Sequence, residues 1–377
     1  ILYPDNLGDK EDEILCHSIS DNMIADLKKV SSIRSPSFNT VQKFKNSKLP
    51  LSEIARRLNV DNIVSGSMLK VNGKLKVSLE MLNTISGQCW SEAWESSTKY
   101  TGTLNGQMIS RILEILDVEI PEQIKRYFTY EMTENADAYE SYLKGKRIID
   151  FLDNPDTLKE SEKHFQVAIN LDPEFVEAYA YLGTSYRWMY RFEESEEKLS
   201  EALKIAKESF NEPGLAAVFN HLGILYRFWE KYSKAIEYFE KGLELEIKLE
   251  DRFGEAKFLQ NMAACYSYIS KKDKCESFFL KALTIYEELE EEHAIGNTQA
   301  EMGTSYKKRG EYSLTLTHYF RALGKFRKLD MSFNEYRVMV MILDTYENLG
   351  MYGEIEENIL YTIDQAEEYQ DYLSLGI

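Results

Sequence analysis

The hydrophobic pattern of the carboxyl-terminal part of the chain repeats with a step of forty residues. Two neighbouring positions, an apolar one and a close-packing one, recur with Tyr three residues further on. The five copies are Leu182-Gly183, Leu222-Gly223, Met262-Ala263, Met302-Gly303 and Ile342-Leu343. Apolar positions spaced three and four apart within each copy predict amphipathic helices. The period therefore predicts a stack of helix-turn-helix units.

The predicted second helix of each unit keeps the same step. Residues that recur twelve, sixteen and nineteen positions after each close-packing site are Ser195, Ala235, Cys275, Thr315 and Ile355, then Leu199, Phe239, Phe279, Tyr319 and Ile359, then Ala202, Gly242, Ala282, Ala322 and Thr362. Small residues let two helix backbones approach, and the larger ones fill the space between neighbouring units. The last unit departs from this pattern at Leu343 and Ile355.

This spacing resembles the tetratricopeptide repeat (TPR) family, whose own period is 34 residues. A preceding unit with Gly145 and Phe165 keeps the shorter spacing, since Ala168 and Gly183 are fifteen residues apart and later intervals are twenty-one. Six extra residues are nearly two helical turns, so we expect longer helices. The resemblance implies a right-handed superhelix whose first helices line an inner groove that holds a partner protein or peptide.

The first 130 residues show a different pattern, in which helical segments alternate with strands. The expected elements are a helix over 14–30, a strand over Ile33 to Phe38, a helix over 51–58, strands over 62–71, 75–83 and 88–95, and a helix over 108–116. Asn72-Gly73 is a strong hairpin signal between two of these strands. We predict a small α/β domain with a mixed sheet over 1–130, followed over 131–377 by an all-α solenoid of about six units, five with the forty-residue period.

Residues 1 to about 95 resemble the amino-terminal domain of TolB-like and FlgO-like bacterial proteins. The resemblance rests on Ile1-Leu2-Tyr3-Pro4, Asn6-Leu7-Gly8-Asp9, Ile14-Leu15 with Asp21 and Leu27, 54–60, Val64-Ser65-Gly66-Ser67 and 87–92. Ser18 replaces a Gly that is common in the family. Such domains followed by tetratricopeptide repeats often lie downstream of an effector, such as a class III adenylate or guanylate cyclase, a winged-helix DNA-binding domain or a protein kinase. The resemblance implies no catalytic residue.

The net charge of −18 lies in the repeats, because residues 1–130 carry 16 acidic and 16 basic side chains and the remaining 247 carry 47 and 29. An acidic solenoid is a poor binder of nucleic acids and anionic membranes. No apolar run is long enough to span a bilayer. Four cysteines without metal-ligand spacing favour buried free thiols and a cytoplasmic protein.

No enzyme motif is present, whether a nucleophile elbow, a phosphate-binding glycine loop or a zinc-protease helix. The five histidines are scattered, and the acidic run near Asp9 lacks the spacing of a calcium loop. We therefore expect no catalytic residue, metal or cofactor in this segment. The chain begins within an expected strand at Ile1, so we expect it to be part of a longer protein, with any catalytic domain upstream.

A polar stripe defines the candidate ligand site. Family experience places groove-facing residues six and three positions before, and four after, each close-packing site. The basic and amide residues at these offsets are Arg187, Asn220, Arg227, Lys257, Gln260, Asn297 and Lys307. Amides pair with a peptide backbone and Arg or Lys with carboxylates, so we expect an acidic peptide. The alternative is that any exposed helix face carries such residues. Trp188, Phe228 and Tyr268 follow the stripe, either as shelves for a ligand or as packing between units.

The leading hypothesis is a non-enzymatic regulatory module whose repeats bind a protein or peptide, with the α/β domain acting toward an attached effector. A second hypothesis is a structural adaptor that forms homodimers or larger assemblies through the same repeats. A third is a periplasmic envelope component, since TolB-like domains also occur there.

Overall fold

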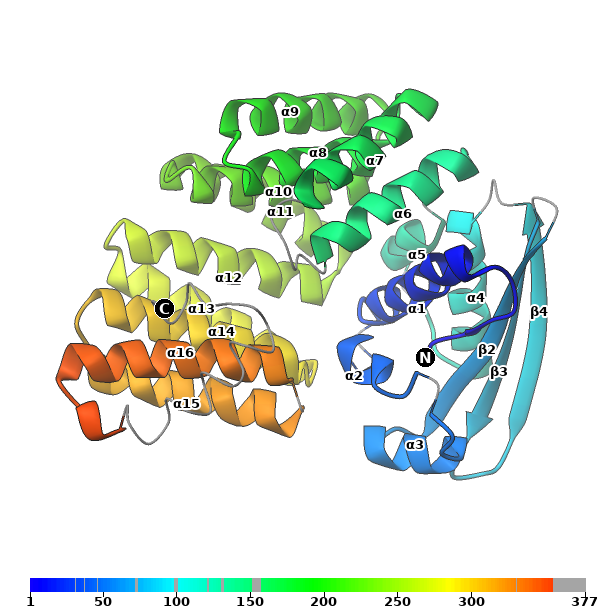
Figure 1. The fold of residues 1–377 in the computed structure, drawn as a ribbon, viewed down its shortest axis with the longest axis horizontal. Coiled ribbons are helices and arrows are strands. Elements are labelled where there is room, and N and C mark those ends of the chain that lie inside the picture. Colours follow the sequence, from blue (N-terminus) through cyan, green and yellow to red (C-terminus); the bar gives the residue numbers. More distant parts are fainter. Residues whose placement is uncertain are drawn as a thin grey trace. The chain divides into compact units, whose positions relative to one another are not determined.

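The computed structural model describes residues 1–354 of the chain, with the exception of residues 31, 37, 46, 72–73, 98–100, 121, 130–131, 151–156 and 330. The chain forms two compact units, Ile1–Gly254 and Glu255–Ile377, which are treated separately below. The first unit holds a small mixed sheet with helices and the first helix pairs of the solenoid; the second unit is helical throughout its described residues (Figure 1). The domain boundary that we predict at residue 130 stays a prediction.

Four strands form the sheet in the order β1-β2-β3-β4. They span Asp5–Asn6, Asn62–Val71, Lys74–Asn83 and Cys89–Ser97. The short β1 pairs with β2 in parallel, whereas β2, β3 and β4 form an antiparallel meander. The mixed sheet and its three long strands are confirmed. The predicted Asn72-Gly73 turn lies outside the described residues, between the paired Val71 and Lys74.

Helices cover one face of this sheet (Figure 1). The helical elements of this part are η1 (Lys10–Asp12), α1 (Glu13–Leu27), α2 (Phe38–Gln42), α3 (Leu51–Leu58), α4 (Thr101–Ile115) and α5 (Glu122–Thr129). Met68, Val77 and Met81 of the sheet share a core with Met23 of α1 and Met108 of α4. Alternation along β3 explains this, because every second side chain points to the same face.

The strand predicted over Ile33 to Phe38 is wrong. The described residues of this segment are in no strand, and Phe38 begins the five-residue helix α2. Phe38 and Val41 of α2 instead bury against Ile24 of α1. Only Ile33 and Phe38 of this segment are large apolar residues, so its pattern did not distinguish a strand from a helix, and packing on α1 decided between them.

The solenoid consists of consecutive helices. In the first unit these are α6 (Ala136–Asp150), α7 (Leu158–Leu171), α8 (Val176–Trp188), α9 (Phe192–Glu208), α10 (Glu212–Phe228) and α11 (Tyr232–Leu249). Then follow α12 (Arg252–Tyr268), α13 (Lys272–Glu288), α14 (Glu292–Lys308), α15 (Tyr312–Lys328) and α16 (Ser332–Leu349). The predicted lengthening is confirmed, since α8 has 13 residues whereas α10 and α14 have 17 each.

Left-handed residues divide each forty-residue repeat into two halves. Positive φ angles recur every twenty residues, at Tyr190, Phe210, Glu230, Glu250, Ser270, Glu290, Gly310 and Gly350. The next backbone N–H then bonds back to a carbonyl five residues earlier, as from Lys231 to Tyr226 at 2.8 Å. This closure satisfies carbonyls at the helix end. Because most of these residues are not glycine, sequence patterns did not reveal it.

The close-packing positions behave as the pattern predicts. A Cβ added to Gly183, Gly223 or Gly303 would lie 2.7, 2.3 or 2.5 Å from the side chain sixteen residues later, namely Leu199, Phe239 or Tyr319. Such distances leave no room for a methyl group, so the small residue is required for the two helices to meet. The predicted positions Ile355, Ile359 and Thr362 of the last unit lie outside the described residues.

Candidate ligand-binding face of the repeats

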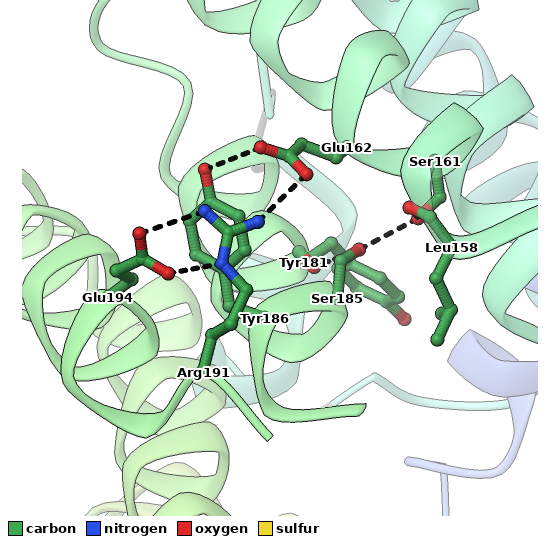
Figure 2. A network of polar contacts seen from close by, with 8 residues as sticks. All are labelled: Leu158, Ser161, Glu162, Tyr181, Ser185, Tyr186, Arg191 and Glu194. Carbon is green, nitrogen blue, oxygen red and sulfur yellow. Dashed lines mark hydrogen bonds and ion pairs between the residues drawn. The ribbon is translucent and has the colours of Figure 1, made fainter. Parts of the chain in front are cut away.

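A polar network joins α8 and the turn after it to α7 of the preceding repeat (Figure 2). The Tyr186 hydroxyl of α8 donates a 3.0 Å hydrogen bond to Glu162 of α7. Arg191, in the turn after α8, pairs with Glu162 at 3.1 Å and with Glu194 at 2.9 Å. Its guanidinium also lies 4.1 Å from the centre of the Tyr186 ring. The end of α8 is therefore held by one tyrosine and one arginine.

The same arrangement recurs further along the chain. In the first unit, the Tyr226 hydroxyl donates to Glu196, and Lys234 Nζ lies 3.1 Å from the same carboxylate. In the second unit, Arg309 pairs with Glu276 at 3.3 Å. Tyr186 and Tyr226 immediately precede Arg187 and Arg227 of the predicted stripe. The network therefore orients the ends of α8 and α10, where Arg187 and Arg227 lie.

The first compact unit, Ile1–Gly254, contains three residues of the predicted stripe. Arg187 lies in the last turn of α8, and Asn220 and Arg227 lie on α10. The positions of Arg187 and Asn220 are not those of an exposed polar face, because they are only 8% and 7% exposed. Arg227 is half-buried. These values do not fit the alternative that the stripe is an ordinary solvated helix surface in this unit.

Arg187 has an unusual environment for a buried arginine. Its guanidinium carbon lies 4.7 Å from the centre of the Trp188 ring and 4.5 Å from that of Phe228. Among the described residues, Nη1 has no hydrogen-bond partner and no carboxylate forms an ion pair with this side chain. Burial, and after it the positive charge of Arg227, lower the pKa of the Arg187 guanidinium to about 10. The group is still charged at neutral pH.

Two aromatic rings border this cation and stay accessible. Trp188 and Phe228 are 41% and 42% exposed, and their ring centres are 6.0 Å apart with planes inclined by 60°. The Arg227 guanidinium lies 5.7 Å from the Phe228 ring. These aromatic residues follow the stripe in the sequence, which did not decide whether they face a ligand or pack between repeats. Only the packing of α8 against α10 brings Phe228 onto Arg187.

The second unit contains the remaining four predicted residues, Lys257, Gln260, Asn297 and Lys307. The Gln260 amide donates to Glu301 at 3.0 Å and accepts from Thr298 at 3.1 Å. Asn297 lies 3.1 Å from His293, one turn earlier on α14. Lys307 forms an ion pair with Asp344 of α16. Lys257 is exposed on α12. Internal contacts therefore occupy most of the stripe here.

Tyr268 of the second unit occupies the same repeat position as Trp188 and Phe228. It is 48% exposed, and the Lys308 ammonium lies over its ring. The two residues occupy equivalent positions, five residues after Ala263 and Gly303. A cation over an exposed ring is a modest attraction, on the order of 1 kcal/mol. The cation and aromatic pairing seen at Arg187 thus recurs, but without the burial.

Metal sites and membrane-spanning helices are absent from the residues that the structure describes. In the ranges that the structure describes, no three His, Cys, Asp or Glu side chains are arranged to hold a metal ion. No described helix has the length and apolar content needed for a bilayer span. Cys265 and Cys275 are buried free thiols, and Cys275 Sγ lies 3.2 Å from the Ser305 hydroxyl. The expected packing role of Cys275 is confirmed.

Comparison with known proteins supports the repeat assignment. Residues 175–246, which cover α8 to α11, match the family model described as tetratricopeptide repeat. A curated relative, "Putative adenylate cyclase 3" of Rhizobium meliloti (strain 1021), is 21% identical over 223 residues, which are 57% of this chain and 37% of the relative. The match thus spans little more than a third of that relative's length.

Solved structures resemble the chain at low sequence identity. A Rap protein, crystallised in complex with competence and sporulation factor, has a TM-score of 0.49 and 16% identity, over 72% of this chain and 88% of its own. BtubC from P. vanneervenii has a TM-score of 0.45 and 18% identity, over 58% and 90%.

Proposed function

We propose that this chain is a non-enzymatic interaction module whose repeats bind a partner protein or peptide, in the regulatory part of a larger bacterial signalling protein. The observation that supports binding most directly is the face formed by Trp188, Phe228, Arg187 and Arg227 within the segment that matches the repeat family. Half-exposed aromatic rings beside cations are typical of protein-binding surfaces, which are enriched in Tyr, Trp, Phe and Arg.

The signalling context rests on two further observations. The relative named as an adenylate cyclase aligns over 57% of this chain. The four-stranded mixed sheet with helices on one face is compatible with the TolB-like resemblance of residues 1–95. We therefore propose a cytoplasmic TolB-like domain and repeats that lie downstream of an effector, such as a nucleotide cyclase or a transcriptional regulator. The test is the open reading frame upstream of Ile1: the absence of an effector domain there would contradict this context.

The binding proposal is tested with selected peptides. A random dodecapeptide library is panned on the full chain, and the affinities of enriched peptides are measured by fluorescence anisotropy. Because the repeats are acidic and the predicted stripe is basic, we expect acidic peptides. Charge reversal in Arg227→Glu should weaken binding about tenfold, an effect typical of an interfacial charge.

Lys204→Glu provides the matched control for charge. Lys204 is 74% exposed on α9, outside the predicted stripe. Arg187 is unsuitable for charge reversal, because its burial would place a carboxylate inside the protein. Circular dichroism checks that each variant keeps its helices. If selected peptides bound Arg227→Glu as tightly as the unchanged chain, the proposed face would be wrong.

A scaffold that assembles copies of this chain is the second candidate. It differs in one outcome, since sedimentation would show dimers or larger species without any peptide. Stable dimers together with no enriched peptide would favour the scaffold.

A further inference from the structure

Arg187 is a buried cation that the described chain surrounds with aromatic rings and a second cation but no carboxylate. We propose that Arg187, together with Arg227, binds a side-chain carboxylate of the partner, while Trp188 and Phe228 hold an apolar side chain next to that carboxylate. The ligand is thus a peptide in which Asp or Glu adjoins an aromatic or aliphatic residue. This assignment rests on the proposed function of the repeats and specifies the chemistry of its ligand.

Nη1 of Arg187 is a buried donor that has no hydrogen-bond partner among the described residues. Buried polar groups in folded proteins nearly always have hydrogen-bond partners, and a buried charge usually has a counter-charge. Arg187 is 8% exposed, and its Nη1 has no partner among the described residues. The nearby Arg227 adds positive charge instead of compensating it. A planar carboxylate fits the guanidinium because two parallel N–H groups can donate to its two oxygens.

Other arginines and lysines of the repeats have acidic partners in the structure. Arg191 and Arg309, in the turns after the first helices, each pair with two carboxylates. Lys307, which occupies the same repeat position as Arg187, pairs with Asp344. The chain thus neutralises these cations internally but leaves Arg187 without an acidic partner. Since the surrounding repeats are rich in Asp and Glu, a carboxylate from outside the described chain is the missing group.

The aromatic rings specify what adjoins the carboxylate. Trp188 and Phe228 cover the guanidinium and are 41% and 42% exposed. Nη1 is buried, so a ligand reaches it only when a neighbouring side chain changes rotamer, and such changes are common when interfaces form. A ring that turns aside still offers its apolar face to the ligand. An acidic residue alone would leave this face in water, whereas a neighbouring apolar residue would cover it.

The simplest probe that contains both parts is 3-phenylpropionate, a carboxylate joined to a phenyl ring. Its neutral isostere 3-phenylpropanamide and inorganic phosphate serve as comparisons. The full chain is titrated with each compound, and the indole N–H resonance of Trp188, assigned with Trp188→Phe, is followed by NMR. We expect saturable shifts with 3-phenylpropionate at least tenfold larger than with either comparison compound at equal concentration.

Variants then locate the binding groups. Arg187→Gln should weaken 3-phenylpropionate binding at least tenfold, and Arg227→Gln severalfold, whereas Lys204→Gln should leave it unchanged. If Arg187→Gln did not fold, the Arg227→Gln result and the amide comparison would still decide. Equal binding of the amide, or undiminished binding by Arg227→Gln, would overturn the carboxylate assignment. An equal response to phosphate would show a general anion site and would overturn it too.

The peptides selected with the library separate this inference from the proposed function. Peptides that depend on Arg227 in the anisotropy assay, yet bind Arg187→Gln as tightly as the unchanged chain, would leave the proposed function standing and refute the role of Arg187. Peptides that lose at least tenfold in affinity on Arg187→Gln, and on replacement of their own Glu by Gln, would support both. Loss in the double change no greater than in either single change would show that the two groups contact each other.

Discussion

The Tyr127 hydroxyl donates a 2.7 Å hydrogen bond to the Glu246 carboxylate and so ties α5 to α11, 119 residues later in the chain. The Lys29 ammonium of α1 lies 4.7 Å from the centre of the Tyr127 ring and 3.9 Å from Asp251. Three segments that are remote in sequence therefore meet in one buried cluster of charged and polar groups. Burial and the adjacent Glu246 raise the pKa of Tyr127, which stays a hydrogen-bond donor.

Removal of the Tyr127 hydroxyl should lower the stability of the first unit. Hydrogen bonds to charged groups contribute about 1.5–3 kcal/mol, so Tyr127→Phe is expected to reduce the free energy of unfolding by about 2 kcal/mol. Urea unfolding followed by circular dichroism measures it. Tyr190→Phe is the matched control, because the Tyr190 side chain is 79% exposed. Equal midpoints for the two variants would mean that the bond to Glu246 contributes nothing.

Asp26 should make stability depend on pH. Burial raises the pKa of its carboxyl from 3.8 to about 6, against the opposing effect of Lys29 at 3.8 Å; Asp251 adds to the rise. The folded chain therefore takes up this proton at a higher pH than the unfolded chain. The contribution to stability is fully present below about pH 4 and is lost as the pH rises through about 6.

Asp26→Asn keeps the neutral form at every pH. The variant should gain stability relative to the unchanged chain as the pH rises from about 4 to about 7. The gain is at most about 3 kcal/mol, and we expect less because the side chain is 22% exposed. Denaturant titrations at several pH values compare the two proteins. A difference in unfolding free energy that stayed constant over this range would refute the assignment.

Two glycine substitutions should act in opposite directions. In Gly223→Ala the new Cβ would lie 2.3 Å from the Phe239 ring, so overpacking is expected to cost about 1–3 kcal/mol. In Gly324→Ala the Cβ meets nothing within 4 Å, and the better helix propensity of Ala should stabilise α15 by about 0.5–1 kcal/mol. Thermal unfolding of both variants checks the signs. Stabilisation by Gly223→Ala would contradict close approach of α10 and α11.

The four thiols should differ sharply in reactivity. Cys89 is exposed, whereas Cys16, Cys265 and Cys275 are buried. Burial also raises the pKa of Cys16 to about 12 and raises that of Cys275, and the thiolate is the reactive form. Ellman's reagent at neutral pH should therefore modify one thiol quickly and the other three only after denaturation. Cys89→Ser should abolish the fast phase; a second fast thiol in that variant would contradict the described burial.

Periodicity was sufficient to predict the helices of the solenoid and their lengthening. Gly183 and Gly223 are forty residues apart in the sequence, which corresponds to two helices per repeat. An apolar face of that period can be buried only by stacking neighbouring repeats. The sheet was also predictable, because strict alternation along Lys74–Asn83 allows one buried face. The segment Ile33 to Phe38 was not, since its two large apolar residues show no period, and the packing of α2 on α1 decided its conformation.

The sequence by itself determined which positions pack and which residue types lie at the ends of the first helices. It did not determine whether each polar residue finds an internal partner. Lys307 pairs with Asp344 and Gln260 with Glu301, whereas Arg187 contacts Phe228 and, among the described residues, pairs with no carboxylate. Only the tertiary structure decided this, because each contact joins side chains about forty residues apart, and the packing of one helix on the next sets whether their charged groups meet.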